Sequence, residues 1–274
     1  LVLALGHHAP SVGCHLVAYS QSKVKSWRRC QKQFAFRQDY APEGKELVRR
    51  VPKLALSLGS WMHELQQAHH REWAGLEGKG ARWEVVQERE TKKFNAYFDE
   101  DKEELGDLPA ETTRLFRAYL RFWSEHDKER YRVAPLLDGR PAIEFTVEVS
   151  LDRWGIADPF KGRIDLLVED LEYGGLWVWD HKWVSRIPDS DDRMMSPQAL
   201  MYSWALRKLG YDIRGFVYNY GRKKAPVIPH VLKRPAGQLS QRQNMDTDYY
   251  TYLSAIRDAH GKNWKTAART MYRD

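Results

Sequence analysis

Three consecutive strand-like segments in the second half of the chain constrain its fold more than any other feature. Residues 143–151 (IEFTVEVSL) alternate apolar and polar side chains, which is typical of a strand with one buried face. Apolar runs follow at 160–170 and 176–184, and the turn-forming sequence EDLEYGG joins them. Short connections favour antiparallel neighbours, so the three segments are predicted to form a meander.

The third segment, LWVWDHKWV, carries charge where a buried strand should carry none. Successive strand residues point to opposite faces, so Asp180 and Lys182 share the aliphatic face, whereas His181 lies on the tryptophan-rich face. A carboxylate and an ammonium group among aliphatic side chains cost free energy unless they are paired or used in chemistry. A buried ion pair is the simplest interpretation of this segment alone, and a functional site is the alternative.

Asp165, in the middle of the second segment, favours the functional alternative. Pairing of the second and third segments can bring Asp165 close to Asp180. Two carboxylates at that range repel strongly in a low dielectric, and unpaired ionised acids are rarely buried. A divalent cation resolves the repulsion, since Mg²⁺ and Mn²⁺ prefer hard oxygen ligands. These two strands therefore predict a metal site.

Helical patterns lie on both sides of the strands. Apolar residues repeat at helical spacing over 20–37 and 54–73, and in the second segment the predicted buried stripe is Leu54, Leu58, Trp61, Leu65 and Ala68. Residues 81–133 are predicted to form two helices with a turn near GDLPA. Downstream, Ser196 is a good N-cap, Pro197 suits the first helical position, and Gly210 closes the helix. The remaining predicted elements are strands at 213–222 and 226–232 and a last helix at 246–260. The fold class is therefore α/β or α+β, with a helical first half, a mixed sheet, and a helix returning onto that sheet.

The charge balance suits a polyanionic partner. The 274 residues include 44 Lys and Arg against 37 Asp and Glu, a formal net charge of +7. Basic residues interleaved with aromatic ones gather between positions 23 and 37 without an acid, which favours phosphate contact over a merely solvated face. No apolar run is long enough to span a membrane. The 2 cysteines make no disulfide framework, so we expect a reducing, cytoplasmic compartment.

In combination, these segments resemble the PD-(D/E)XK nuclease superfamily, and in detail its RecB-like branch, which includes CRISPR-associated and phage exonucleases. The residues that carry the resemblance are, in chain order, GSWMH at 59–63, Glu144, GRID at 162–165, Asp180-His181-Lys182, and QALMY at 198–202. The tail from 226 to 253 resembles that of phage relatives. The match covers most of residues 19–260, and the order of the motifs is more specific than any one of them.

The resemblance implies a restriction-endonuclease-like mixed central sheet flanked by helices. It implies a single nuclease domain over 1–274, with a helical insertion at 75–140 and a catalytic sheet core at 141–232. It also implies roles for individual residues. The catalytic set is Glu144, Asp165, Asp180 and Lys182, with Lys182 orienting the attacking water. The metal ligands are His63, Asp165, Asp180 and the main-chain carbonyl of His181, and the cation is Mg²⁺ or Mn²⁺.

The DNA-binding residues implied are Gln198, Tyr202, Arg28, Arg29 and Lys32. Gln198 lies in a first helical turn, where free N–H groups favour a phosphate, and Tyr202 shares its helix face. Tyr202 is equally explained by core packing. His63 falls nearly opposite the apolar stripe of its helix, so periodicity alone predicts a solvent-facing side chain. We expect His69 and His70 at the surface, and the ring of His181 packed rather than ligating.

The function expected from this resemblance is that of a metal-dependent exonuclease in phage-like DNA recombination or repair, acting on single strands or duplex ends. The basic segments at 23–37 and 222–234, the second with Arg222, Lys223, Lys224, Lys233 and Arg234, are expected to follow the DNA backbone. The alternatives are an endonuclease of the same fold, cutting single-stranded or branched DNA, and a DNA-binding module without catalysis. No cysteine follows Cys30, so the four thiolates of an iron–sulfur cluster cannot be assembled, and we expect Cys30 to be a small core residue. The chain has no helicase-type phosphate loop, so unwinding would fall to a helicase or recombinase partner.

Overall fold

The computed structural model describes residues 19–32, 34, 52–76, 78, 82–126, 129–194, 196–232, 238–240, 247 and 249–271. Predictions for the end of the first helix and the start of the last one fall outside these ranges. The basic residues Lys233 and Arg234 also lie outside them. Within the described ranges no helix is long and apolar enough to cross a membrane.

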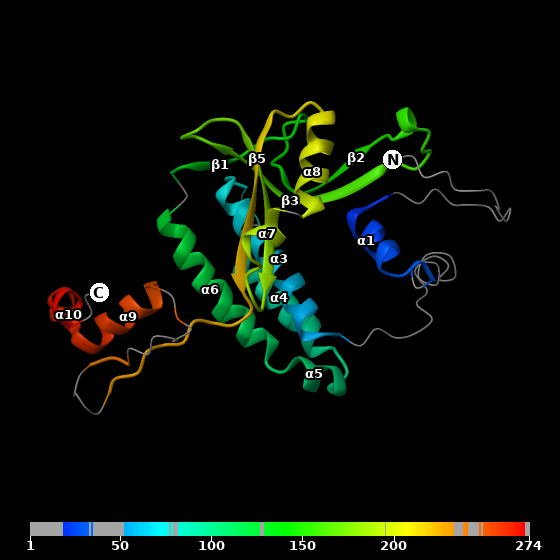
Figure 1. Ribbon diagram of the computed structural model, residues 1–274. Helices are drawn as coiled ribbons and strands as arrows, with labels where there is room; N and C mark the ends of the chain where they lie inside the picture. Colours follow the sequence, from blue (N-terminus) through cyan, green and yellow to red (C-terminus); the bar gives the residue numbers. More distant parts are fainter. Residues whose placement is uncertain are drawn as a thin grey trace.

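A five-stranded mixed sheet forms the centre of the molecule (Figure 1). Its antiparallel meander consists of β2 (Ile143–Val149), β3 (Phe160–Asp170) and β4 (Leu176–Val184), which confirms the predicted arrangement. β5 (Ile213–Arg222) runs parallel to β4 at one edge. A short strand, β1 (Tyr131–Val133), pairs antiparallel with β3 at the other edge.

Two predictions about strands were wrong. Residues 131–133 were expected to end a helix, but they form β1 because Tyr131 and Val133 suit a strand and find partners in β3. Residues 226–232 were expected to form a strand, but they make only an isolated bridge between Val231 and Leu239. Pro226 and Pro229 lack the N–H groups that a ladder requires.

One helix covers the face of the sheet beneath β2 and β5. α8 (Pro197–Lys208) connects β4 to β5, as a parallel pair requires, and Pro197 opens it as predicted. Its buried residues Tyr202, Ala205 and Leu206 join the core formed with β2 and β3. Ser196 precedes the helix as predicted, but its side chain makes no capping hydrogen bond, and its Oγ accepts one from the Tyr218 hydroxyl at 2.7 Å.

Helices from the first half of the chain cover the opposite face. α3 (Leu54–Trp73) has the predicted bounds and buries four residues of the predicted stripe, namely Leu58, Trp61, Leu65 and Ala68. The fifth, Leu54, was wrongly predicted to be buried, since it is 44% exposed at the first position of the helix. The segment predicted as two helices contains three, namely α4 (Trp83–Asn95), α5 (Asp99–Leu105) and α6 (Leu108–His126). The additional break between α4 and α5 falls at residues 96–98, and Gly106, with φ of 57°, ends α5.

Shorter elements complete the described fold. α1 (Gln21–Arg29) begins where predicted, with the Ser20 hydroxyl accepting from the Lys23 N–H at 3.3 Å. Cys30 is exposed at its end, so the expectation of a core residue was wrong, because α1 buries none of its residues. The other short elements are η2 (Asp152–Trp154), α7 (Ser190–Met194), α9 (Tyr249–His260), η3 (Gly261–Asn263) and α10 (Trp264–Met271).

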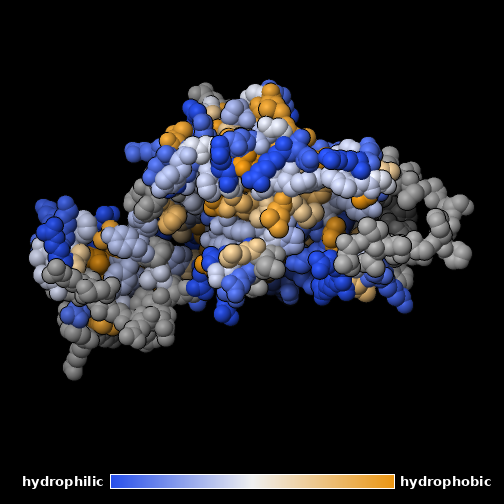
Figure 2. Space-filling model, turned by 45° about the horizontal axis from the view of Figure 1, so that its top comes forward, coloured by the Kyte–Doolittle hydropathy of each residue, from blue (hydrophilic) through white to orange (hydrophobic). Residues whose placement is uncertain are grey.

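The C-terminal helices form a separate small core to the side of the sheet, where Figure 1 shows α9 and α10 in orange and red. Leu239, Ala255, Ile256 and Ala267 are its buried members. The face seen in Figure 2 is largely hydrophilic, with apolar residues gathered across its middle. The main cores thus lie on both sides of the sheet, and the candidate site lies where α3 crosses it.

Candidate active site

An open cleft of about 500 Å³ lies between the first half of α3 and the strands of the meander. Its lining includes His63 from α3, Glu144 from β2, Asp165 from β3 and Lys182 from β4. These four residues, predicted from motifs far apart in the sequence, therefore share one cavity. Asp180 is almost fully buried at the edge of this group, with 2% of its surface exposed.

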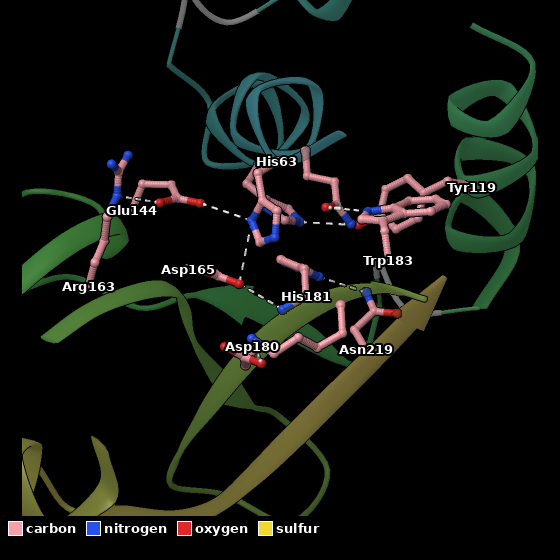
Figure 3. A network of polar contacts seen from close by, with 12 residues as sticks. His63, Tyr119, Glu144, Arg163, Asp165, Asp180, His181, Trp183 and Asn219 are labelled. Atoms are coloured by element: carbon pink, nitrogen blue, oxygen red, sulfur yellow. Dashed lines mark hydrogen bonds and ion pairs between the residues drawn. The ribbon is translucent and has the colours of Figure 1, made fainter. Parts of the chain in front are cut away.

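His63 and two carboxylates form a compact cluster in this cleft (Figure 3). His63 Nδ1 lies 3.6 Å from Glu144 Oε1 and 3.6 Å from Asp165 Oδ2. One ligand atom from each of the three residues lies within 4.8 Å of the others. The His63 side chain, 31% exposed, faces the cleft rather than open solvent, although its helix position alone favoured the latter.

The backbone is irregular at the point where the two carboxylates meet. Glu144 has φ of 48°, the positive value being unusual for a residue with a side chain. Its neighbours Ile143 and Phe145 belong to cores on different sides of the sheet, although strict alternation would place them on one face. The left-handed conformation at Glu144 therefore interrupts the alternation of β2 side chains between the two faces of the sheet, and it does so directly opposite Asp165. Such strained backbone clusters at functional sites.

Asp180 is held by two neighbours. Its Oδ2 lies 2.6 Å from Lys182 Nζ, and its Oδ1 accepts a hydrogen bond of 2.8 Å from Gln198 Nε2 at the start of α8. The buried ion pair first considered for this strand is therefore present. This pair interacts electrostatically with the histidine–carboxylate cluster. The charge of Asp180 acts to raise the pKa of Asp165, and the charge of His63 acts to lower the pKa of Asp180.

The electrostatics of the cluster are those of crowded carboxylates. Burial, with the charges of Asp180 and Glu144, raises the pKa of Asp165 to about 6 against the opposing charge of His63. Burial also raises the pKa of Asp180, although Lys182 opposes the shift. Burial acts to lower the pKa of His63, but its hydrogen bond to Glu144 and the negative charges of Asp165 and Glu144 outweigh it and raise that pKa. A positive charge placed among these groups would be stabilised.

The donor set fits a divalent cation. One imidazole nitrogen and carboxylate oxygens from two strands can converge on a single ion, and this mixture suits Mn²⁺ or Mg²⁺. The sequence prediction named His63, Asp165, Asp180 and the His181 carbonyl as ligands. The structure brings Glu144, rather than Asp180, into the compact group with His63 and Asp165.

His181 contributes its main chain to the cluster, and its ring is buried. Its N–H donates to Asp165 Oδ2 at 2.7 Å, while its Nδ1 lies 3.0 Å from the Asn219 amide. The ring stacks on that of His70 with centroids 4.9 Å apart. His70 is only 2% exposed, so its predicted surface position was wrong. The position of His70 on its helix could not reveal this burial, because it depends on stacking against the ring of His181 from β4.

Gln198 and Tyr202 support the site from beneath. Gln198 contacts Asp180, as described above. Tyr202 is buried against Gly162, where a Cβ atom would lie 2.8 Å from the tyrosine ring. Burial, together with the charge of Asp180, raises the pKa of Tyr202 to about 12. Their predicted contact with DNA stays a prediction, as does that of Arg28, Arg29 and Lys32 around α1.

Arg163 was missed as a site residue by sequence reasoning, whereas Lys223 belongs to the basic segment 222–234 that was expected to follow the DNA backbone. Arg163 Nε donates to Glu144 Oε2 at 2.7 Å, and Arg163 is 64% exposed along the cleft. The signal was present, because Arg163 lies inside the GRID motif next to Asp165. Lys223 Nζ donates to the Ala55 carbonyl at 2.7 Å and thereby ties the end of β5 to the first turn of α3. Burial lowers the pKa of Lys223.

Comparison with known protein families agrees with this geometry. The PD-(D/E)XK nuclease superfamily matches residues 18–268, which includes every element around the cleft. The chain therefore belongs to the PD-(D/E)XK nuclease superfamily. Its mixed sheet flanked by helices is consistent with the restriction-endonuclease-like fold expected for that superfamily. A search of curated proteins gives no match.

Proposed function

We propose that the protein is a divalent-metal-dependent deoxyribonuclease of the RecB-like branch that acts as an exonuclease in phage-like DNA recombination or repair. The observation that carries this proposal is the convergence of His63, Glu144 and Asp165 beside the Asp180–Lys182 pair in one open cleft. Family membership supports nuclease activity in general. The exonuclease assignment rests on the order of the sequence motifs.

The cleft residues suit phosphodiester hydrolysis, which needs an aligned water molecule and positive charge around the phosphate. A divalent cation held by His63 and Asp165, with Glu144 and Asp180 beside them, would supply positive charge and lower the pKa of an attacking water. Lys182 would orient that water and stabilise the charge developing on the phosphate. Arg163, at the rim of the cleft, is placed to contact a neighbouring phosphate.

The remaining proposals follow from the net charge and the resemblance. The substrate is DNA, either single-stranded or at duplex ends, and its contacts ignore sequence because they are made to phosphates. The cation is Mg²⁺ or Mn²⁺, and the compartment is cytoplasmic. A helicase or recombinase is the proposed partner. The chain would form one nuclease domain, with a helical insertion at 75–140 and a sheet core at 141–232.

A cleavage assay with matched variants tests this function. Labelled linear single- and double-stranded DNA is incubated with the protein in Mn²⁺, in Mg²⁺ or in excess chelator. We expect cleavage only with a divalent cation, and a loss of at least about 100-fold in Lys182→Ala, which removes the amine that faces the reacting phosphate. Lys92→Ala, a change of the same charge on the exposed face of α4, should cleave at the wild-type rate.

Two outcomes would contradict the proposal. The first is the absence of metal-dependent cleavage together with intact DNA binding, which describes a binding module. The second is full activity in Lys182→Ala. A closed circular single strand then separates the two nuclease alternatives, because a circle offers no end to an exonuclease and is cut only by an endonuclease.

A further inference from the structure

A second cavity of about 260 Å³ adjoins the cleft on the side of α6. It lies between α6, the carboxyl-terminal ends of β4 and β5, and the start of α9. We call it the aromatic pocket, because its lining includes Tyr119, Phe122, Trp123, Trp183 and Tyr250. The rings of Phe122 and Tyr250 meet edge to face, with centroids 6.5 Å apart and planes at 84°.

Trp183 connects the aromatic pocket to the candidate active site. It follows Lys182 directly in β4, and it lines both the cleft and the pocket. Its Nε1 donates to Gln66 Oε1 at 3.0 Å, which fixes the indole between the two cavities. Figure 3 shows Trp183 and Tyr119 on the side of His63 opposite Glu144 and Arg163. A ligand that reaches from Lys182 across Trp183 therefore enters the pocket.

Basic side chains border this path. At the end of β5, Lys223 lines the cleft, while Arg222 and Lys224 line the aromatic pocket. Three consecutive cationic residues thus lie along both cavities. A ligand that combines negative charge with flat aromatic groups is complementary to this arrangement, and a nucleic acid strand has both. The apolar side chains of a protein partner would match the rings but not the cations.

We propose that the aromatic pocket binds an unpaired nucleobase of single-stranded DNA, from a nucleotide near the phosphate held beside Lys182. This proposal rests on the proposed nuclease function and deepens it. A base must leave its duplex stack to enter the pocket, so the protein requires a single strand or a frayed end at the point of cleavage. Stacking on aromatic faces tolerates any base, so the requirement adds no sequence preference.

Binding of oligonucleotides that lack one base tests the pocket. Short single strands carry one abasic site, placed at successive positions, and their affinity for Lys182→Ala protein is measured by fluorescence anisotropy in Mn²⁺. We expect one or two adjacent positions at which removal of the base weakens binding about tenfold. In Lys182→Ala/Phe122→Ala protein this position-dependent loss should fall below about twofold, because Phe122, 47% exposed, supplies a pocket wall.

A control substitution outside the pocket and a second pocket variant accompany the measurement. Phe98→Ala, which removes a 67% exposed aromatic ring at the start of α5, should leave the abasic profile unchanged. Should Phe122→Ala fail to fold, Tyr250→Ala tests the facing wall. A flat abasic profile, or one that is the same with and without the pocket substitution, would overturn the proposal.

The two proposals fail in different ways. Metal-dependent cleavage by the wild-type protein with a flat abasic profile removes the base pocket and leaves the nuclease. A position-dependent profile that Phe122→Ala abolishes, in a protein that never cleaves DNA, leaves the pocket and removes the nuclease.

Discussion

The carboxylate of Asp165 in β3 accepts a hydrogen bond of 2.7 Å from the main-chain N–H of His181 in β4. A strand pair normally exchanges only main-chain bonds at such a position, so the side chain here replaces part of the ladder. The bond fixes one acid to the strand that carries Asp180 and Lys182. The acid that every version of the proposed mechanism requires is therefore held by the sheet rather than by a loop.

The raised pKa of Asp165 predicts how the stability of the metal-free protein depends on pH. Between the ordinary value of 3.8 and about 6, the folded state binds more protons than the unfolded state, so stability falls as pH rises through this window. The Asp165→Asn substitution removes this pH-dependent loss of stability, because the side chain no longer ionises. The amide oxygen of the new side chain can still accept the hydrogen bond from the His181 N–H. At pH 8 without metal, the variant should be more stable than the wild type by roughly 1–3 kcal/mol, as measured by urea unfolding, and the gain should vanish towards pH 4.

Asp170 provides the opposite case as a control. Its hydrogen bond with Arg130 lowers its pKa, so the stability that it contributes is present above its ordinary pKa and is lost as pH falls. Asp170→Asn should therefore destabilise the protein at neutral pH. A loss of stability in Asp165→Asn at pH 8 would show that Asp165 stabilises the fold as an ordinary paired acid.

Binding of a cation should reverse the difference in stability between Asp165→Asn and the wild type. Because a ligand that binds only the folded state stabilises it, addition of Mn²⁺ should raise the melting temperature of the wild type. Asp165→Asn and His63→Ala, each lacking a proposed ligand, should show little or no increase. Thermal scans with and without Mn²⁺ measure this, and an equal increase in all three proteins would place cation binding elsewhere.

Gln198 has two candidate roles, the contact with DNA predicted from the sequence and the support of Asp180, and its hydrogen bond favours the second. Its amide donates to Asp180 Oδ1 at 2.8 Å, so Gln198→Ala frees the carboxylate to move. Loss of such a supporting contact typically costs about 10–100-fold in metal affinity or activity. The Mn²⁺ concentration for half-maximal cleavage should rise, whereas KM for DNA should change little. Leu200→Ala, at a 71% exposed position of the same helix, is the matched control. A pure KM effect would favour direct contact with DNA.

Close packing between β3 and α8 should make Gly162 intolerant of a side chain. A Cβ atom there would lie 2.8 Å from Tyr202 Cε1, so Gly162→Ala must displace the ring and should destabilise the protein by about 1–3 kcal/mol. Gly59 in α3 meets nothing within 4 Å, so Gly59→Ala should be neutral or slightly stabilising. Chemical unfolding of both variants provides the comparison, and equal stabilities would contradict the described packing.

Much of the fold could be predicted from local pattern alone. The alternation in β2 and the apolar stripe of α3 are strong signals because one face of each element is buried. β1 could not be predicted, because a three-residue strand is decided by its partner Val168 and its neighbours rather than by its own periodicity. The same holds for residues 226–232, where two prolines outweighed the apolar composition.

The site was predictable in its residue types more than in its geometry. Spacing and motif order pointed to Asp165, Asp180 and Lys182, and the structure brings them to neighbouring strands. The alternation of apolar and polar residues could not show the positive φ of Glu144. This conformation occurs where the side chains of β2 switch from one face of the sheet to the other. Nor could the sequence pattern show that His70 and His181 stack in the core, because that contact joins α3 to β4 across 111 positions of sequence, from 70 to 181.

The central claim is that His63 and Asp165 hold a divalent cation between α3 and the sheet. The most direct measurement is a crystal structure of the Mn²⁺-soaked protein, with the ion located by anomalous scattering. We predict one Mn²⁺ peak about 2.0–2.6 Å from His63 Nδ1 and from an Asp165 oxygen, with the His181 carbonyl and an oxygen of Glu144 or Asp180 as further protein ligands. A peak elsewhere in the molecule, or none at saturating Mn²⁺, would contradict the account.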